Sequence, residues 1–393
     1  MIALEMYIQV YRHMYSHAYS GAMSPSHPHS PSVRSPSSPA SGPSVVGRAW
    51  AALVPDHVFD FWAARISPTW SRRRPLARIV ARQVAADHTV TLVLAPNRHV
   101  RMPAPGQHMV VGAEVDGRRV GRSYSPSPLP GRRLAITVKA VADGRLSRHL
   151  VQSARVGDVL SLGEPFGTFA LPRDDAPVLL LAGGSGITPL MALLRAEAAR
   201  GFTRPITLAC WVRTPGEACF VDELRAIADA HPSLRLHLAT TREADPRFAH
   251  GRLDAAILAG WTGEGAAPHV LACGSAGFVA HARALCTDVA ASFQAEAFSP
   301  PPAPDGEQGE AEIHLSRSGT TLRVPRNQPL LVALEAAGLR PAHGCRMGIC
   351  NSCACGKSAG TTRDVLSGAR DPEPATALRL CVNAAAGDLV LDL

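Results

Sequence analysis

The sequence contains little lysine, few aromatic residues and no long apolar run. Only two of its 40 basic residues are lysines, Lys139 and Lys357, and aromatic side chains make up 5% of the 393 residues. No apolar run reaches the roughly 18–20 residues that a membrane-spanning helix needs. The N-terminus also lacks an apolar core followed by a small-residue cleavage site, the pattern of a secretory signal. We therefore expect a globular cytoplasmic protein without an integral membrane segment.

The charge distribution and the cysteine count argue against two further classes of protein, those that bind nucleic acid and those held by disulfides. The formal net charge is +8, but the arginines are scattered and no zinc-finger or helix-turn-helix pattern accompanies them, which argues against nucleic-acid binding. Nine cysteines are too few for a disulfide scaffold, yet four of them lie between Cys345 and Cys355. Such crowding indicates metal or redox chemistry.

Composition and hydrophobic periodicity divide the chain into several domains. Residues 22–45 are rich in Ser, Pro and His and cannot offset their ordering entropy. From Leu76 apolar residues alternate as in an antiparallel barrel, and after Pro177 buried strands alternate with helices as in an α/β domain. The predicted segments are a disordered N-terminus (1–47), a helical extension (48–75), an antiparallel β-barrel (76–174), an α/β domain (175–298), a Pro-rich linker (299–309) and an α+β domain (310–393).

Within these segments the sequence predicts individual elements. In the extension, one helical face carries apolar residues and is expected to pack on the next domain: Trp50, Leu53, Val58, Phe61 and Trp62. The barrel is expected to contain strands at 76–82, 88–94, 107–114, 118–125, 132–140 and 158–162, and a helix at 145–152. The α/β domain is expected to contain strands at 178–182, 205–212, 234–240, near 269–272 and at 290–297, and helices at 189–200 and 221–230. The last domain is expected to contain strands at 311–316, 320–325 and 388–392, and a helix at 329–337.

The strongest motif is a cysteine loop, C-x4-C-x2-C, followed by a distant fourth cysteine. This is the ligand spacing of plant-type 2Fe–2S ferredoxins, in which three thiolates on one loop surround one side of the cluster and the fourth arrives from another element. The predicted ligands are Cys345, Cys350, Cys353 and Cys381. A zinc site of four cysteines is the main alternative, but such sites usually form two separate knuckles. Cys355 falls outside the ligand spacing and is expected to be a packed small residue.

Two motifs in the predicted barrel suit a flavin. In Arg122-Ser-Tyr-Ser125, the guanidinium can pair with phosphate, the Tyr ring can stack and the Ser can donate to the isoalloxazine ring. About 15 residues later, Lys139-Ala-Val-Ala-Asp-Gly-Arg-Leu-Ser147 opens a predicted helix. A Gly-x-x-Ser turn at a helix N-terminus presents free N–H groups to a phosphate. An ordinary strand edge and helix cap are the alternative.

A third motif, Ala182-Gly-Gly-Ser-Gly-Ile-Thr-Pro189, joins a predicted buried strand to a helix. Glycine-rich turns of this kind bind pyrophosphate through backbone N–H groups and the helix dipole. The motif is not the Rossmann GxGxxG, so a purely structural glycine turn remains an alternative.

In this order the motifs resemble those of the ferredoxin–NADP reductase superfamily. The last ~85 residues, with GCRMGICNSCACGK and LCVNAAAGDLVLDL, resemble the ferredoxin domain of modular oxygenase and desaturase reductases. The resemblance implies a flavin-binding β-barrel, a nucleotide-binding α/β domain and a β-grasp 2Fe–2S domain. It implies a flavin site made of Arg122, Ser123, Tyr124, Ser125, Lys139, Val141, Gly144, Arg145, Leu146 and Ser147. It implies a nicotinamide-nucleotide site that includes Gly183, Gly184, Gly186, Thr188, Pro189, Cys273 and Gly274.

The resemblance also implies catalytic residues beside the flavin and nicotinamide rings: Ser125, Cys273, Glu296 and Phe298. Cys273-Gly274 resembles a family Cys-Gly-Pro, although Ser275 replaces the proline and leaves the shape of that loop open. A buried inert thiol is the alternative for Cys273. Plain packing is the alternative for Glu296 and Phe298.

The sequence favours NADPH over NADH and FAD over FMN. A 2′-phosphate needs cations at the ends of strands, and the residues expected there are Arg213, Thr241 and Arg242. The separate pyrophosphate turn favours FAD, although FMN-dependent relatives share these modules.

Together the three motifs predict an NAD(P)H-dependent oxidoreductase that passes electrons through FAD and a 2Fe–2S cluster to a partner protein. The segment SPTWS (67–71) and the GCRMGIC loop resemble reductases of fatty-acid or acyl-CoA desaturases, so a desaturase that docks the protein to the inner membrane face is the expected acceptor. A ring-hydroxylating or other oxygenase is the alternative acceptor. A redox sensor is the alternative function, but a sensor does not need both flavin and nicotinamide sites.

Overall fold

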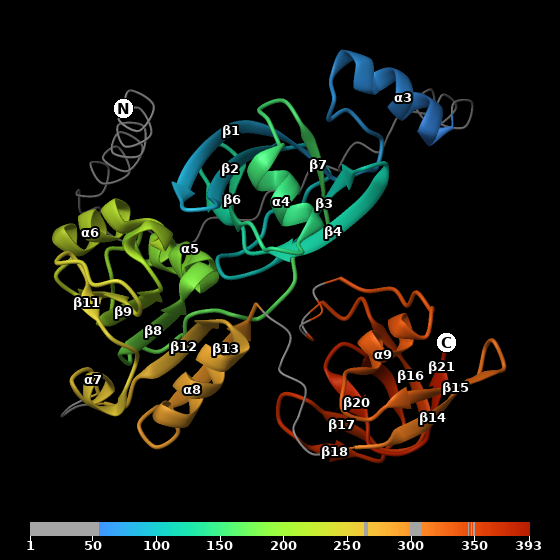
Figure 1. Cartoon of the computed structure of the whole chain (residues 1–393). Coiled ribbons are helices and arrows are strands. Elements are labelled where there is room, and N and C mark those ends of the chain that lie inside the picture. The colour runs from blue at the N-terminus through green and yellow to red at the C-terminus, as the bar shows by residue number, and fades with distance from the viewer. Residues whose placement is uncertain (1–54, 263–265, 299–307, 345, 347, 349) are drawn as a thin grey trace, which may run out of the picture. The chain divides into compact units, whose positions relative to one another are not determined.

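The computed structural model describes residues 55–393 apart from 263–265, 299–307, 345, 347 and 349 (Figure 1). The predictions for residues 1–54, for most of the linker and for Cys345 therefore lie outside the described residues. The chain divides into two units, residues 1–74 and 75–393.

The first unit contains helix α3 (Asp56–Ile66). Asp60 on this helix accepts hydrogen bonds from Ser71 Oγ at 2.9 Å and from the Arg72 backbone N–H at 3.1 Å. The face that the sequence predicts to be buried is open, because Phe61 is 57% exposed and Trp62 is 62% exposed. The helix is held within its own unit by polar contacts to residues 71–72, and the packing of its aromatic face on the next domain stays a prediction.

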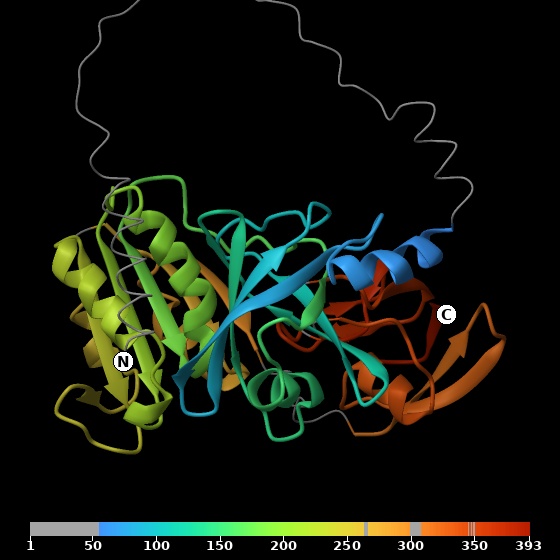
Figure 2. The same ribbon diagram turned by 90° about the horizontal axis from the view of Figure 1, so that it is seen from above.

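The second unit begins with an antiparallel half-barrel whose strands pair in the order β4-β3-β7-β1-β2-β6-β5. Buried apolar side chains such as Leu92, Val111 and Leu134 form its core. Helix α4 packs against these strands and lies at one end of them (Figures 1 and 2). The elements are β1 (Leu76–Ala86), β2 (Thr89–Pro96), β3 (Met109–Val115), β4 (Arg118–Tyr124), β5 (Ser127–Leu129), β6 (Arg133–Lys139), α4 (Arg145–Gln152) and β7 (Val159–Leu162).

The next domain contains a six-stranded parallel sheet in the order β11-β10-β9-β8-β12-β13. Alternate residues of β8 face opposite sides: Leu180 packs with α5 and α6, and Leu179 with α7 and α8 (Figure 1). Burial on both faces explains the continuous apolar run of β8. The elements are β8 (Val178–Gly183), the 3₁₀ turn η1 (Gly184–Gly186), α5 (Ile187–Ala198), β9 (Ile206–Val212), the 3₁₀ turn η2 (Pro215–Glu217), α6 (Val221–Ala230), β10 (Leu234–Thr240), β11 (Ala249–His250), α7 (Ala255–Ala259), β12 (His269–Gly274), α8 (Ala276–Cys286) and β13 (Ser292–Ala297).

The C-terminal domain contains a five-stranded mixed sheet, β15-β14-β21-β16-β19, and a small sheet, β18-β17-β20. Helix α9 and these strands share one apolar core that includes Ile313, Leu334 and Leu391. The elements are β14 (Glu310–Leu315), β15 (Thr320–Pro325), α9 (Leu330–Ala336), β16 (Ala354–Ala359), β17 (Thr362–Asp364), β18 (Arg370–Asp371), β19 (Ala375–Arg379), β20 (Asn383–Ala385) and β21 (Leu389–Asp392). The expected hairpin, helix and last strand are present, and β16 to β20 are elements that the sequence did not predict.

Candidate electron-transfer site

The first part of the site lies where β4 ends. Ser125 follows this strand and is buried, while burial raises the pKa of the Tyr124 phenol well above its usual value, so that the phenol stays neutral. Arg122 is exposed and donates to the carbonyl of Gly121. The hydroxyl of Ser123 is buried and has no hydrogen-bond partner in the part of the chain that the structure describes. This buried polar atom fits a site that a polar ligand completes.

A buried histidine links Ser125 to the neighbouring domain. His108 Nε2 lies 3.4 Å from Ser125 Oγ and 3.1 Å from Glu296 Oε2, and the His108 side chain is 1% exposed. Ser125 and His108 belong to the barrel, whereas Glu296 lies on β13 of the α/β domain. The structure therefore brings the predicted residues Ser125 and Glu296 together through a residue that sequence reasoning missed. No local pattern marks His108, because it is a single histidine that precedes a strand.

The predicted phosphate turn precedes α4, but most of its side chains are already engaged or point away. Ser147 Oγ accepts from the Val141 N–H and donates to the Gly144 carbonyl, both at 3.2 Å. Leu146 is a core residue, whereas Val141 and Arg145 are exposed. Ser147 therefore shapes the turn, and the free groups that remain for a phosphate are the backbone N–H groups of the first helical turn.

The glycine turn after β8 packs tightly against the end of β12. A Cβ on Gly186 would lie 2.0 Å from the Cys273 carbonyl oxygen, and one on Gly274 would lie 3.1 Å from Gly183 Cα. The strands β8 and β12 are neighbours in the sheet, with Ala182 opposite Cys273. The predicted glycine turn and the predicted Cys-Gly loop thus meet where the strand order changes direction, which is where open α/β sheets bind ligands. Only glycine leaves the backbone room to approach this closely.

The remaining residues of this turn form the start of α5. Gly184 begins η1 with φ +58°, Thr188 Oγ1 donates to the Ser185 carbonyl at 3.1 Å, and Pro189 lies in the first turn of the helix. The helix begins at Ile187, two residues before the predicted start, because η1 leads directly into it.

Cys273 is a neutral thiol in the core. It is fully buried, and burial, followed by the nearby charge of Glu296, raises its pKa well above the usual range. It lies opposite Glu296 in the β12–β13 pairing, and the backbone N–H of Phe298 donates to the Gly274 carbonyl at 2.8 Å. Cys273, Glu296 and Phe298 are therefore neighbours at one sheet edge.

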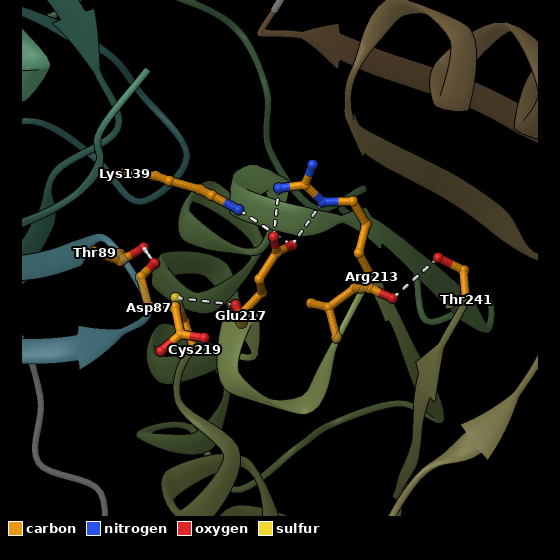
Figure 3. Close-up of polar contacts among 8 residues, drawn as sticks. Asp87, Thr89, Lys139, Arg213, Glu217, Cys219 and Thr241 are labelled. Atoms are coloured by element: carbon orange, nitrogen blue, oxygen red, sulfur yellow. Dashed lines mark hydrogen bonds and ion pairs between the residues drawn. The ribbon is translucent and has the colours of Figure 1, made fainter. Parts of the chain in front are cut away.

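The residues predicted to bind a 2′-phosphate also meet. The backbone N–H groups of Thr241 and Arg242 donate to the carbonyls of Val212 and Arg213, at 2.9 and 3.0 Å. Arg213 forms an ion pair with Glu217, and Glu217 also holds Lys139 (Figure 3). Lys139 was predicted at the flavin site, but in the structure its side chain bridges to the α/β domain.

In the C-terminal domain, the cysteine loop is held by hydrogen bonds to β19 and the residues after it. Gly348 N–H donates to Cys381 Sγ at 3.2 Å, and Arg379 donates to the Gly348 carbonyl at 2.6 Å. A hydrogen bond with the Cys381 thiol and several backbone hydrogen bonds lower the pKa of Cys353 to about 6, which favours the thiolate that iron binds. Burial instead raises the pKa of Cys355 to about 11, as expected for a packed thiol.

These cysteines offer a donor set that suits an iron–sulfur cluster. Cys350, Cys353 and Cys381 are described, whereas Cys345 is not. No group of three His, Cys, Asp or Glu side chains within the described ranges is arranged to hold a metal ion. The four-cysteine ligand set therefore stays a prediction. No helix among the described residues is long and apolar enough to cross a membrane.

Three family models match consecutive parts of the chain. An oxidoreductase FAD-binding domain matches residues 79–171, an oxidoreductase NAD-binding domain matches 180–284, and a 2Fe-2S iron-sulfur cluster binding domain matches 313–384. An NADPH oxidoreductase of Mycobacterium tuberculosis is 34% identical over 360 residues, which cover 89% of this chain and 91% of the relative. The chain belongs to the ferredoxin–NADP reductase family.

Other relatives of this reductase match most of the chain. The glycine betaine monooxygenase reductase subunit of Chromohalobacter salexigens is 30% identical over 77% of this chain and 90% of its own length. Among solved structures, phthalate dioxygenase reductase, described as a modular structure for electron transfer from pyridine nucleotides to [2Fe-2S], matches with a TM-score of 0.56 and 27% identity. That match covers 81% of this chain and 97% of the other. The protein is therefore an oxidoreductase with FAD-, NAD- and 2Fe-2S-binding domains, which confirms the three predicted classes of cofactor site.

Gly186→Ala tests the close approach of the glycine turn. Because the new Cβ would overlap the Cys273 carbonyl, the turn must shift, and a shift of about 1 Å can lower kcat/KM for the nicotinamide nucleotide on the order of 100-fold. Flavin content should stay unchanged, since Gly186 is not in the barrel. Steady-state kinetics and the visible spectrum measure both quantities.

The matched control is Gly277→Ala on α8, where an added Cβ meets no atom within 4 Å. Equal kinetics for Gly186→Ala and Gly277→Ala would contradict the role assigned to the turn.

Proposed function

We propose that this reductase takes hydride from NADPH and delivers electrons one at a time to an oxygen-activating iron enzyme. The observation that carries the proposal is the meeting of Ser125 and Glu296 through His108, beside the sheet edge that carries Cys273 and the glycine turn. Groups predicted for the flavin thus lie near groups predicted for the nicotinamide, which supports hydride transfer between the two rings. A bound flavin supplies the conversion of a two-electron donor into one-electron output.

Each domain contributes defined groups in this proposal. In the barrel, Arg122 pairs with a flavin phosphate, Tyr124 stacks on the ring system and Ser125 donates to it. In the α/β domain, the backbone of the glycine turn and the N-terminus of α5 hold the pyrophosphate of the nucleotide. In the C-terminal domain, four thiolates hold the cluster: Cys345, Cys350, Cys353 and Cys381.

We propose NADPH as the preferred donor because Arg213 and Arg242 lie side by side at the ends of β9 and β10. We expect kcat/KM for NADPH to exceed that for NADH when reduction of ferricyanide is followed at low ionic strength, since the arginines attract the additional phosphate dianion. Arg242→Gln should lower kcat/KM for NADPH by about tenfold and leave the value for NADH unchanged.

Asp229→Asn, an exposed change on α6, controls for variation between preparations. An efficiency with NADH that equals or exceeds the efficiency with NADPH would refute this preference.

The identity of the acceptor is also a proposal. Sequence resemblance favours a fatty-acid or acyl-CoA desaturase, whereas the relatives named above include reductases of a monooxygenase and of a dioxygenase. Both classes draw single electrons into iron centres that activate oxygen. We expect the purified reductase with NADPH to support product formation by one of the two classes when each is supplied as the purified terminal enzyme. Turnover by an oxygenase and none by a desaturase would discard the desaturase, and the reverse would discard the oxygenase.

Cys381→Ala tests the order of electron flow. Loss of this predicted ligand should remove the cluster, so iron content and the signal of the reduced cluster in electron paramagnetic resonance should fall. Reduction of ferricyanide by NADPH should persist, because this acceptor can take electrons from the flavin, while transfer to the terminal enzyme should fall at least about 100-fold.

Cys355→Ala is the matched control because Cys355 is a buried cysteine of the same domain outside the ligand spacing. It should retain iron and transfer to the terminal enzyme. Full transfer by Cys381→Ala would contradict a relay through the cluster.

A further inference from the structure

One carboxylate, that of Glu217, holds two cations that come from different domains. Its Oε2 lies 3.2 Å from Lys139 Nζ, at the end of barrel strand β6, and accepts from Arg213 Nε at 3.1 Å. Its other oxygen pairs with the second guanidinium nitrogen of Arg213 (Figure 3). The Glu217 side chain is only 14% exposed, so it is screened far less than a surface carboxylate.

Glu217 is held in place by its backbone. It ends η2, where its N–H donates to the Thr214 carbonyl at 3.1 Å, and the preceding Gly216 carbonyl accepts from the Asp87 N–H at 2.7 Å. A Cβ on Gly216 would lie 2.1 Å from an Asp87 carboxylate oxygen. The turn is therefore packed against the barrel segment at Asp87, which fixes the backbone position from which the Glu217 side chain reaches Arg213 and Lys139.

The carboxylate is ionised at neutral pH. Burial alone would raise the pKa of Glu217, but the hydrogen bonds from Arg213 and Lys139 outweigh burial and lower it. Arg213 is 52% exposed and is the first residue after β9, where its carbonyl accepts from the Arg242 N–H. One edge of the guanidinium is thus bound by Glu217, while about half of the Arg213 side chain is exposed.

We propose that Glu217 is a specificity-determining residue that limits the preference for NADPH by neutralising Arg213. The inference rests on the proposed nucleotide site and names a residue that changes the preference of this site for NADPH over NADH. A 2′-phosphate that reaches Arg213 must share it with the Glu217 carboxylate, and the two anions repel each other. NADH carries no 2′-phosphate and does not meet this repulsion.

Glu217→Gln tests the proposal because it keeps the shape of the side chain and removes its charge. In the FAD-loaded full-length protein, isothermal titration calorimetry should show NADP⁺ bound about fivefold or more tightly than by the wild type. The affinity for NAD⁺ should stay within about twofold of the wild-type value. Asp229→Asn, which removes one negative charge from an exposed position of α6, should change neither affinity.

Two further variants test the cause of the change, and the second of them keeps Glu217 itself. In an Arg213→Ala background, Glu217→Gln should no longer change NADP⁺ affinity, because the cation that it releases is absent. Lys139→Met leaves Glu217 intact but removes one of the two cations that pair with its carboxylate. The full negative charge of the carboxylate then acts on Arg213. NADP⁺ should then bind more weakly than to the wild type, with NAD⁺ unchanged.

Unchanged or weaker NADP⁺ binding by a folded Glu217→Gln would overturn the proposal. An equal gain for NADP⁺ and NAD⁺ would also overturn it, because Arg213 would then contact the pyrophosphate that both share. The proposal that NADPH is the preferred donor can be refuted separately. If the wild type binds NAD⁺ more tightly than NADP⁺ while Glu217→Gln shifts the ratio toward NADP⁺, the donor preference is wrong and the role of Glu217 stands.

Discussion

The contact between His108 and Glu296 is the interaction on which the proposed site depends. Each side chain is almost fully buried, and each comes from a different domain of the second unit. Burial of a carboxylate and of an imidazole costs a large desolvation free energy, and these two side chains face each other across the domain boundary. Because Ser125 also contacts His108, the same interaction fixes a group predicted for the flavin against the sheet that carries the nucleotide turn.

In the proposed site, the α/β domain brings the nucleotide to that contact. The glycine turn after β8 and the loop after β12 approach so closely that only backbone atoms fit between them. Parallel strands end at one edge of the sheet, so the residues that follow β8, β9, β10, β12 and β13 gather there although they are far apart in the chain. In our proposal, the polar groups along this edge, with Glu217 between two cations, set which nucleotide the edge favours.

In the C-terminal domain, local hydrogen bonds hold the cysteine loop. Gly348 has a positive φ of 74°, and its N–H and carbonyl bond to Cys381 and Arg379 respectively. A thiolate that accepts a backbone N–H is stabilised in the charged form, and such hydrogen bonds tune the reduction potential of a cluster. The environment of the predicted cluster is therefore determined by residues close to its own ligands.

The sequence by itself determined the three domains, their order and most of the helices and strands that position the site. It could do so because hydrophobic periodicity, glycine turns and cysteine spacing are local patterns; α6 and β10, for example, have the bounds that the sequence predicts. Only the tertiary structure showed that His108 joins Ser125 to Glu296, that Ser147 is used by its own turn, and that Lys139 reaches Glu217. These are contacts between side chains distant in sequence or choices among competing hydrogen-bond partners, and no local pattern encodes either.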